Sequence, residues 1–115
     1  MRYMLLIYGS ESTWNALPEA EKGKIFNEYG EFTDGIRKSG HYLAGDPLDA
    51  TTGARTVRKH NGKAVKTDGP FAETREQLGG YYIVEAKSLD EATDIAARIP
   101  GARVGSIEVR RIIEM

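Results

Sequence analysis

The amino-acid sequence predicts an α+β domain with a ferredoxin-like βαββαβ order and a β-hairpin inserted between the second and third strands. Three observations lead to this prediction. Two short segments, 2–8 and 79–86, are apolar at both odd and even positions, as in strands buried on both faces. Two longer segments, 18–39 and 89–99, carry apolar residues at three- and four-residue steps, which is typical of helices. Asn61-Gly62 is the strongest short-range signal of a hairpin turn.

The composition bounds the size of the fold and its chemistry. The chain has 115 residues, a common size for one domain, so we expect a single domain over residues 1–115. It has no cysteine, which excludes disulfides, thiol nucleophiles, zinc–thiolate sites and Fe–S clusters. Its 16 basic and 17 acidic residues give a net charge of −1, so no global field favours nucleic acid or an acidic membrane.

No segment of the sequence has the length of a membrane span. The longest apolar run is Met4–Tyr8, far short of the roughly 20 residues that a bilayer requires. The N-terminal residues do not form an apolar segment followed by a small-residue cleavage site. We therefore expect a cytoplasmic protein that has no membrane partner.

The first half of the chain reads as strand, helix and strand. After the strand 2–8, Pro18 is expected in the first turn of a helix that ends at Ser39-Gly40. Residues 41–48 follow as a short strand ended by Pro47. The apolar stripe of the helix consists of Ile25, Phe26, Tyr29, Phe32 and Ile36.

The second half begins with the hairpin. Residues 54–60 and 63–67 are expected to pair around Asn61-Gly62, both at positive φ. Residues 68–77 read as irregular, and strand 79–86 follows. A capping box at Ser88-Leu89-Asp90-Glu91 opens the second helix, and Pro100-Gly101 stops it. The apolar stripe of this helix consists of Leu89, Ala92, Ile95, Ala96 and Ile99. In the segment 105–113 apolar residues alternate with polar ones, which predicts the last strand.

The two doubly apolar strands predict a partner for the sheet. Two helices can cover only one face of a four-stranded sheet, yet strands 2–8 and 79–86 are apolar on both faces. A second copy of the same sheet would cover the other face, with a cavity between the two. We therefore expect a homodimer.

The run Thr-Asp-Gly-Pro-Phe-Ala-Glu-Thr-Arg-Glu-Gln-Leu-Gly-Gly-Tyr-Tyr at 67–82 resembles the DGPF branch of the YCII-related family. The resemblance covers nearly the whole chain and implies a bacterial protein with a dimeric α+β barrel, often linked to an extracytoplasmic-function sigma factor. Other members carry a His–Asp pair, with histidine in the first helix and aspartate before the proline that ends the second. Here 18–39 contains no histidine, and Ile99 precedes Pro100, so the pair does not transfer. Arg75 replaces a more familiar lysine.

Asp68 heads the most family-specific run, and two interpretations of it stay open. In the structural one, Asp68 starts a turn with Gly69 and Pro70 and accepts backbone N–H groups of residues 70–72, and Phe71 plugs the core. In the functional one, Asp68, Glu73 and Glu76 line a ligand pocket near Tyr8 or Tyr82, where they would act as a general base, hold a cation or bind a basic ligand. The cluster of strand tyrosines, to which Tyr8 and Tyr82 belong, would pack the core or wall a cavity for a small organic ligand.

The remaining polar candidates give weaker signals. His41, at the start of a strand, is the one plausible imidazole base, although a structural role is the commoner use of such a histidine. His60 adjoins the exposed turn, and two isolated histidines predict no transition-metal site. The sequence indicates no cofactor. The hairpin bases Arg55, Arg58, Lys59, Lys63 and Lys66 read as a solvated edge rather than a nucleic-acid surface, because no aromatic side chains alternate with them.

Three functions follow from these features. The first is a small-molecule-binding or enzymatic domain that uses Asp68. The second is a regulatory or interaction module that acts with a sigma factor. The third, nucleic-acid contact through the hairpin, is the least favoured, and we expect no nucleic-acid partner.

Overall fold

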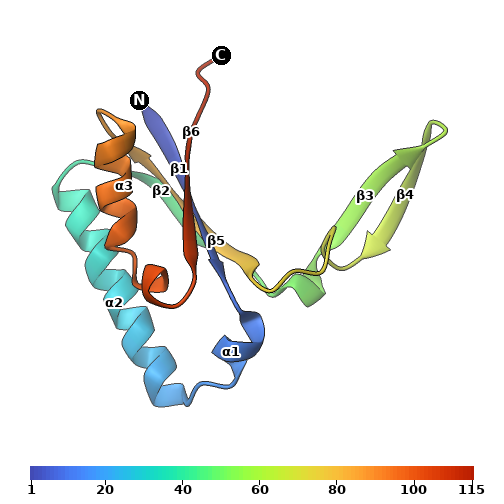
Figure 1. The fold of residues 1–115 in the computed structure, drawn as a ribbon, viewed down its shortest axis with the longest axis horizontal. Helices are drawn as coiled ribbons and strands as arrows, with labels where there is room; N and C mark the ends of the chain where they lie inside the picture. The colour runs from blue at the N-terminus through green and yellow to red at the C-terminus, as the bar shows by residue number, and fades with distance from the viewer.

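The computed structural model describes residues 1–115 and contains a four-stranded antiparallel sheet in the order β2-β5-β1-β6 (Figure 1). This is the ferredoxin-like order, and the α+β prediction is confirmed. A separate two-stranded sheet pairs β3 with β4. Along the chain the elements are β1 (Arg2–Gly9), α1 (Glu11–Asn15), α2 (Glu19–Lys38), β2 (Tyr42–Pro47), η1 (Thr51–Gly53), β3 (Arg55–His60), β4 (Lys63–Asp68), β5 (Gln77–Glu85), α3 (Leu89–Ala97), η2 (Pro100–Arg103) and β6 (Ser106–Arg111).

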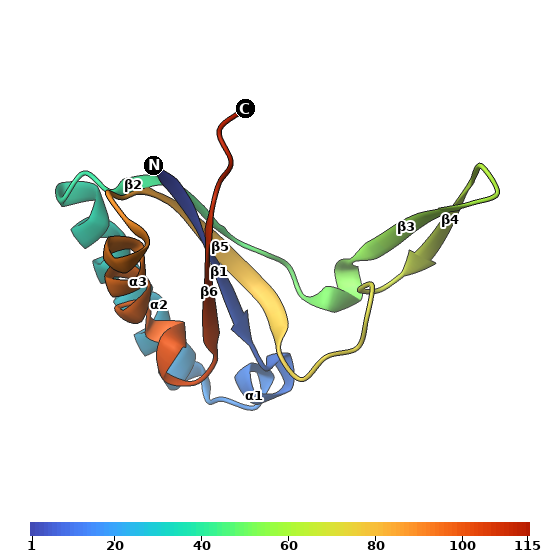
Figure 2. The same ribbon diagram turned by 45° about the horizontal axis from the view of Figure 1, so that its top comes forward.

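The core lies between the sheet and helices α2 and α3, which cover one face of it (Figure 2). Leu5 of β1 and Val84 of β5 are fully buried beneath Ile36 of α2 and Ile95 of α3. Phe32 and Tyr82 add an edge-on aromatic contact with ring centroids 5.2 Å apart. Each fully buried aliphatic side chain contributes about 1.5–3 kcal/mol, so this single layer holds the domain together.

The other face of the sheet has no helix over it, and we call it the open face. Residues directly opposite each other on antiparallel strands point to the same side, so the register defines this face. Leu6 lies opposite Tyr81 and Glu108, and Met4 lies opposite Ile83. The apolar centre of the open face is half-buried in the single chain and consists of Met4, Leu6, Tyr8, Tyr81 and Ile83.

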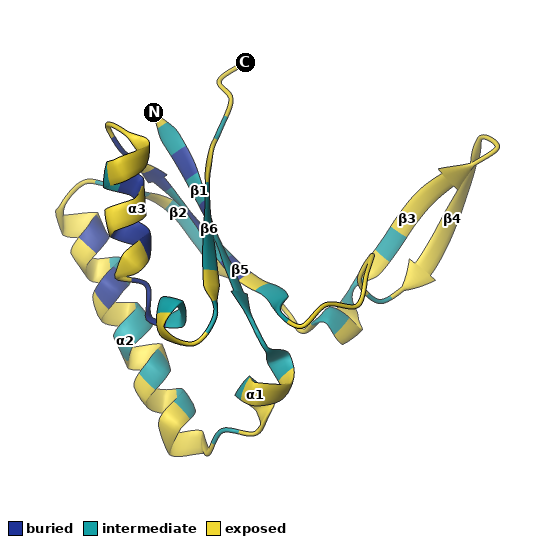
Figure 3. Cartoon of the chain, viewed as in Figure 1, coloured by how far each residue is buried: buried dark blue, intermediate teal, exposed yellow.

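The β3–β4 hairpin, residues 55–68, stands clear of the body, and we call it the arm (Figures 1 and 3). Its turn is the predicted one, with Asn61 at φ 51° and Gly62 at φ 78°. No arm residue is buried, and only Thr56 is half-buried. The arm therefore adds surface to the domain without adding core.

Several element boundaries differ from the prediction. Pro18 is the N-cap residue of α2 rather than part of its first turn, and α3 ends at Ala97, two residues before Ile99. The short helix α1 was missed; its signal is Ser10, whose Oγ accepts the N–H of Thr13. Phe26 is 63% exposed rather than part of the buried stripe, and its ring packs edge-on against Trp14 of α1.

No helix of the chain combines the length and the apolar character that a membrane crossing requires.

Candidate functional site

A shallow hollow of about 600 Å³ lies where the arm joins the body. Its walls come from η1, the end of β4, the loop 69–76 and the start of β5, and most of the residues that line it have polar side chains. Two of the predicted ligand-binding carboxylates, Asp68 and Glu73, line it together with Thr51 and Gln77. The family-specific run thus forms a concave, hydrogen-bonding surface rather than a plug in the core.

Asp68 closes the base of the arm. Its carboxylate accepts a hydrogen bond of 3.1 Å from Arg55 Nε, directly across the ladder, and its side chain is 84% exposed. Beside it Gly69, at φ 104°, donates its N–H to the carbonyl of Ala54. The structure records no backbone N–H from residues 70–72 on this carboxylate, so the local-cap interpretation is not the observed geometry.

The hollow is braced from the body by side chains on three segments. Gln77 Oε1 accepts the N–H of Glu11, and the Glu11 carboxylate accepts both the N–H and the hydroxyl of Thr51, at 2.8 and 2.5 Å. Glu76 does not line the hollow; its carboxylate accepts the hydroxyl of Ser106 from β6, at 2.8 Å. Sequence analysis missed Glu11, whose only signal is its place in the first turn of the missed helix.

Tyr82 and Tyr8 lie on opposite sides of the sheet, and neither lines the hollow in the single chain. Tyr82 faces the helices. Because Thr33 Oγ1 donates to the carbonyl of Tyr29, the Tyr82 hydroxyl donates to Thr33 Oγ1, at 2.7 Å. Burial raises the pKa of Tyr82, so it remains a neutral phenol. Of the predicted set, the fold brings Asp68 and Glu73 together and leaves Tyr8, Glu76 and Tyr82 elsewhere.

A tyrosine–carboxylate pair on the open face was not identified from the sequence. The Tyr81 hydroxyl donates to Asp46 Oδ2, at 2.7 Å, across the β2–β5 ladder. This hydrogen bond raises the pKa of Tyr81, since removing the proton would set two negative charges side by side. Asp46 precedes Pro47 at the end of an edge strand, and its pairing depends on the β2–β5 register.

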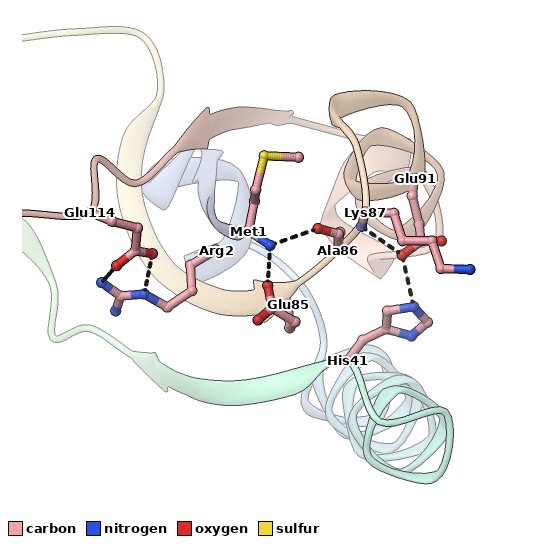
Figure 4. Close-up of polar contacts among 8 residues, drawn as sticks. All are labelled: Met1, Arg2, His41, Glu85, Ala86, Lys87, Glu91 and Glu114. Atoms are coloured by element: carbon pink, nitrogen blue, oxygen red, sulfur yellow. Dashed lines mark hydrogen bonds and ion pairs between the residues drawn. The ribbon is translucent and has the colours of Figure 1, made fainter.

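His41 lies between α2 and β2, and its side chain contacts the start of α3 (Figure 4). Its Nδ1 lies 2.6 Å from Ser39 Oγ, and its Nε2 lies 3.2 Å from Glu91 Oε1. Ser39 Oγ also bonds the carbonyl of Ile36, and Glu91 also accepts the N–H of Lys87, at 3.1 Å. Both ring nitrogens of His41 are engaged by these contacts, so the geometry favours a tie between the end of α2 and the start of α3.

This tie predicts a pH-dependent stability. The pKa of Glu91 lies below its usual range because the N–H of Lys87 donates to the carboxylate and His41 adjoins it. Such a group stabilises the fold above its unfolded-state pKa, about 4.3, and the stabilisation disappears as the pH falls through the lower folded value. We expect wild type to melt above Glu91→Gln at pH 7 and the two curves to converge in acid.

The matched control for this prediction is Asp94→Asn, which neutralises an exposed acid on the same helix. We expect its melting temperature to follow that of wild type at every pH. A Glu91→Gln difference that stays constant from neutral to acid pH would show that the carboxylate charge does not contribute.

Comparison with known proteins identifies the family of this chain. The YCII-related domain model matches residues 1–115. The chain belongs to the YCII-related family. An uncharacterized protein of Rhizobium meliloti (strain 1021) is 37% identical over 112 residues, which cover 96% of this chain and 90% of that protein. The resemblance inferred from residues 67–82 is therefore confirmed.

A solved structure supports the fold of this YCII-related chain. It is the 5-chloro-2-hydroxyhydroquinone dehydrochlorinase TftG from Burkholderia phenoliruptrix AC1100, in complex with 2,5-dihydroxybenzoquinone. The two structures align with a TM-score of 0.56 over 100% of this chain and 96% of that one. The sequence identity is 13%, so the likeness concerns the fold alone.

Proposed function

We propose that this YCII-related chain is a homodimeric small-molecule-binding protein of the bacterial cytoplasm, whose ligand lies between two facing sheets and can undergo reaction there. The observation that carries the proposal is the open face. Leu6, Met4 and Ile83 form an apolar centre on a sheet face that no element of the chain covers. A facing copy would remove that surface from water and enclose the Tyr81–Asp46 pair with Tyr8.

The accessible surface supports association. The chain exposes 8232 Å² for a mass of 12.7 kDa. A compact monomer of that mass exposes about 6,200 Å². The surplus of about 2,000 Å² is larger than the roughly 800 Å² that each partner buries in a standard interface. Only 13 of the 115 residues are buried, so a partner that covers further apolar surface would stabilise the fold.

The ligand class follows from two sets of groups that a facing copy would bring toward one ligand. The carboxylates of Asp68 and Glu73, in the hollow at the base of the arm, accept hydrogen bonds from hydroxyl groups. Tyr8 and Tyr81, on the open face, offer aromatic surfaces. A small polyhydroxylated aromatic compound, or its quinone, matches both features, and the fold relative TftG is in complex with 2,5-dihydroxybenzoquinone. The family His–Asp pair is absent from this chain, so a reaction at this site does not use that pair.

A binding titration with two variants tests the ligand proposal. We expect anaerobic 2-hydroxyhydroquinone, an uncharged aromatic with three hydroxyl donors, to bind wild type in calorimetry. Asp68→Asn should weaken binding by about ten- to a hundredfold, the worth of one hydrogen bond to a charged acceptor. Its melting temperature should change little, because the exposed Arg55–Asp68 pair contributes at most about 1 kcal/mol.

Asp94→Asn on α3, far along the chain from the hollow, is the control and should bind like wild type. Equal affinity for Asp68→Asn and wild type would reduce Asp68 to a structural residue. Absence of binding to wild type by this probe and by 2,5-dihydroxybenzoquinone would contradict the ligand class.

The exposed arm favours a second candidate, a regulatory or interaction module that acts with an extracytoplasmic-function sigma factor. An uncovered, charged hairpin would serve contact with a different protein as well as contact with a second copy of this chain. Co-purification with an extracytoplasmic-function sigma factor, in the absence of ligand binding, would favour this candidate.

A further inference from the structure

We infer that the arm, residues 55–68, is an intersubunit clasp that lies against the acidic body of a second copy of this chain. The inference deepens the proposed homodimer and rests on it: the open faces form the contact, and the arm adds a second, electrostatic one. Neither the sheet pattern nor the ligand proposal requires the arm to touch the partner.

The first observation is that the arm lacks support within its own chain. A two-stranded hairpin is marginally stable in water unless it packs against something. Here the only hydrogen bonds from arm side chains to the rest of the chain lie near its base, from Thr56 Oγ1 to the carbonyl of Gly69 and from Arg58 to the carbonyl of Phe71. The distal part, around Asn61-Gly62, has no such contact (Figure 3). Such an element needs another surface to hold it.

The second observation is the shape of the chain. Its radius of gyration is 16.0 Å, against about 13 Å for a compact domain of this length. The arm also bears exposed apolar side chains, with Val57 at 57% and Val65 at 48%, and Phe71 beside its base is 76% exposed. An extended arm with apolar residues on both of its faces gains stability from a partner that covers it.

The third observation is charge. The arm holds five of the 16 basic residues and one of the 17 acidic ones, a net charge of +4 with neutral histidine. The remaining eleven basic and sixteen acidic residues give the rest of the chain −5. The near neutrality of the whole chain therefore conceals two regions of opposite sign. Because the arm stands away from its own body, the negative charge of that body does not face it. A second copy of the chain, whose body carries the same net charge of −5, offers a complementary partner for the arm.

The fourth observation is direction. In two views α2 and α3 lie on one side of the four-stranded sheet, and the arm extends on the other side (Figures 1 and 2). The arm thus projects to the side on which the open face would meet a second copy. Two-fold symmetry would give each subunit one arm and one acidic surface to receive the other arm.

Charge reversal with a charge-matched control tests the clasp. Arg58, Lys59 and Lys63 are changed together to glutamate, which spares the Arg55–Asp68 pair at the base. The control changes Lys24, Lys38 and Lys87, exposed lysines of the body, to glutamate and shifts the net charge by the same six units. The dimer dissociation constant is measured by sedimentation at about 50 mM and about 500 mM NaCl, where screening differs strongly.

We expect the dissociation constant of wild type to rise with salt, and the arm variant to dissociate at least about tenfold more readily than the control at low salt. At high salt the arm variant and wild type should differ much less. Equal dissociation constants and salt slopes for arm variant and control would overturn the clasp and leave the open-face dimer standing. A monomeric wild type would overturn the dimer itself.

A proximity measurement identifies what the arm touches. Because the chain has no cysteine, His60→Cys near the arm tip accepts a single nitroxide label. Labelled protein is mixed with isotope-labelled, unmodified protein, so that line broadening reports contacts between copies alone. Broadening of acidic body residues supports the clasp, and its absence overturns it. Sub-micromolar, salt-sensitive binding of a DNA or RNA duplex, lost in the arm variant, would also overturn it by assigning the arm to nucleic acid.

Discussion

Leu6→Asp is expected to convert the protein from dimer to monomer while leaving the chain folded. Leu6 lies at the centre of the open face, opposite Tyr81 on β5 and Glu108 on β6. Leu6 is half-buried in the single chain, so in the dimer the exposed parts of two copies leave water and the substitution removes about 1.5–3 kcal/mol of apolar burial. It also places an unpaired carboxylate in each copy beside Glu108, and taking that charge out of water costs further free energy. Since each 1.4 kcal/mol is about tenfold, the dissociation constant should rise more than about a hundredfold.

Leu5→Asp is the matched control, one residue away on the same strand. Leu5 points toward the helices and is fully buried in the single chain. An unpaired charge there costs about 3–5 kcal/mol and should unfold the domain rather than dissociate it. Light scattering and far-ultraviolet circular dichroism on the two variants separate assembly from folding. A Leu6→Asp variant that remains dimeric at micromolar concentration would show that the open face is not the interface.

The Leu5–Leu6 contrast shows what the sequence could predict. Apolar residues at both parities of 2–8 indicated a strand with two buried faces, and the structure assigns one of those faces to the helices and leaves the other open. The ferredoxin-like order and the Asn61-Gly62 turn followed from local patterns, which depend on residues close in sequence. The dimer remains a prediction.

The placement of the candidate site could not be predicted in the same way. Asp68 was expected near Tyr8 or Tyr82, because the family-specific run leads directly into β5. Asp68 instead lines a hollow at the base of the arm that neither tyrosine lines, and the shape of this hollow depends on contacts such as Glu11 to Thr51, forty residues apart. The sequence pattern of strand 79–86, apolar at both odd and even positions, also did not show which face of the sheet Tyr82 occupies. Its burial beneath α2 depends on the register of β5 with β1. Side-chain positions that depend on such long-range contacts have no local signal.

Gly105→Ala is expected to lower the melting temperature by on the order of 10 °C, because no side chain fits at this position. A Cβ on Gly105 would lie 2.1 Å from the carbonyl oxygen of Tyr8 and 3.2 Å from the Cα of Gly9. Both neighbours are backbone atoms at the end of β1, so β6 would have to move away from β1. That movement disturbs the pairing that holds Ile107 against the core.

Gly30→Ala in α2 is the control, since a Cβ there meets no atom within 4 Å. Alanine in a helix interior should stabilise the chain by about 0.5–1 kcal/mol, so the two glycine variants should shift the melting temperature in opposite directions. A Gly105→Ala variant that melts with wild type would mean that the ends of β1 and β6 are farther apart in solution.

The same substitution also tests how the hollow is held, because Ser106, the next residue, bonds the Glu76 carboxylate that braces the loop 69–76. If β6 moves, this contact is lost and the loop bearing Glu73 loosens. Ligand affinity should then fall in Gly105→Ala, and it should fall as well in Ser106→Ala, which removes the hydroxyl and keeps the strand in place. Lower affinity in both variants, with a lower melting temperature only in Gly105→Ala, is the expected result. Wild-type affinity in both would show that the brace from β6 does not shape the site.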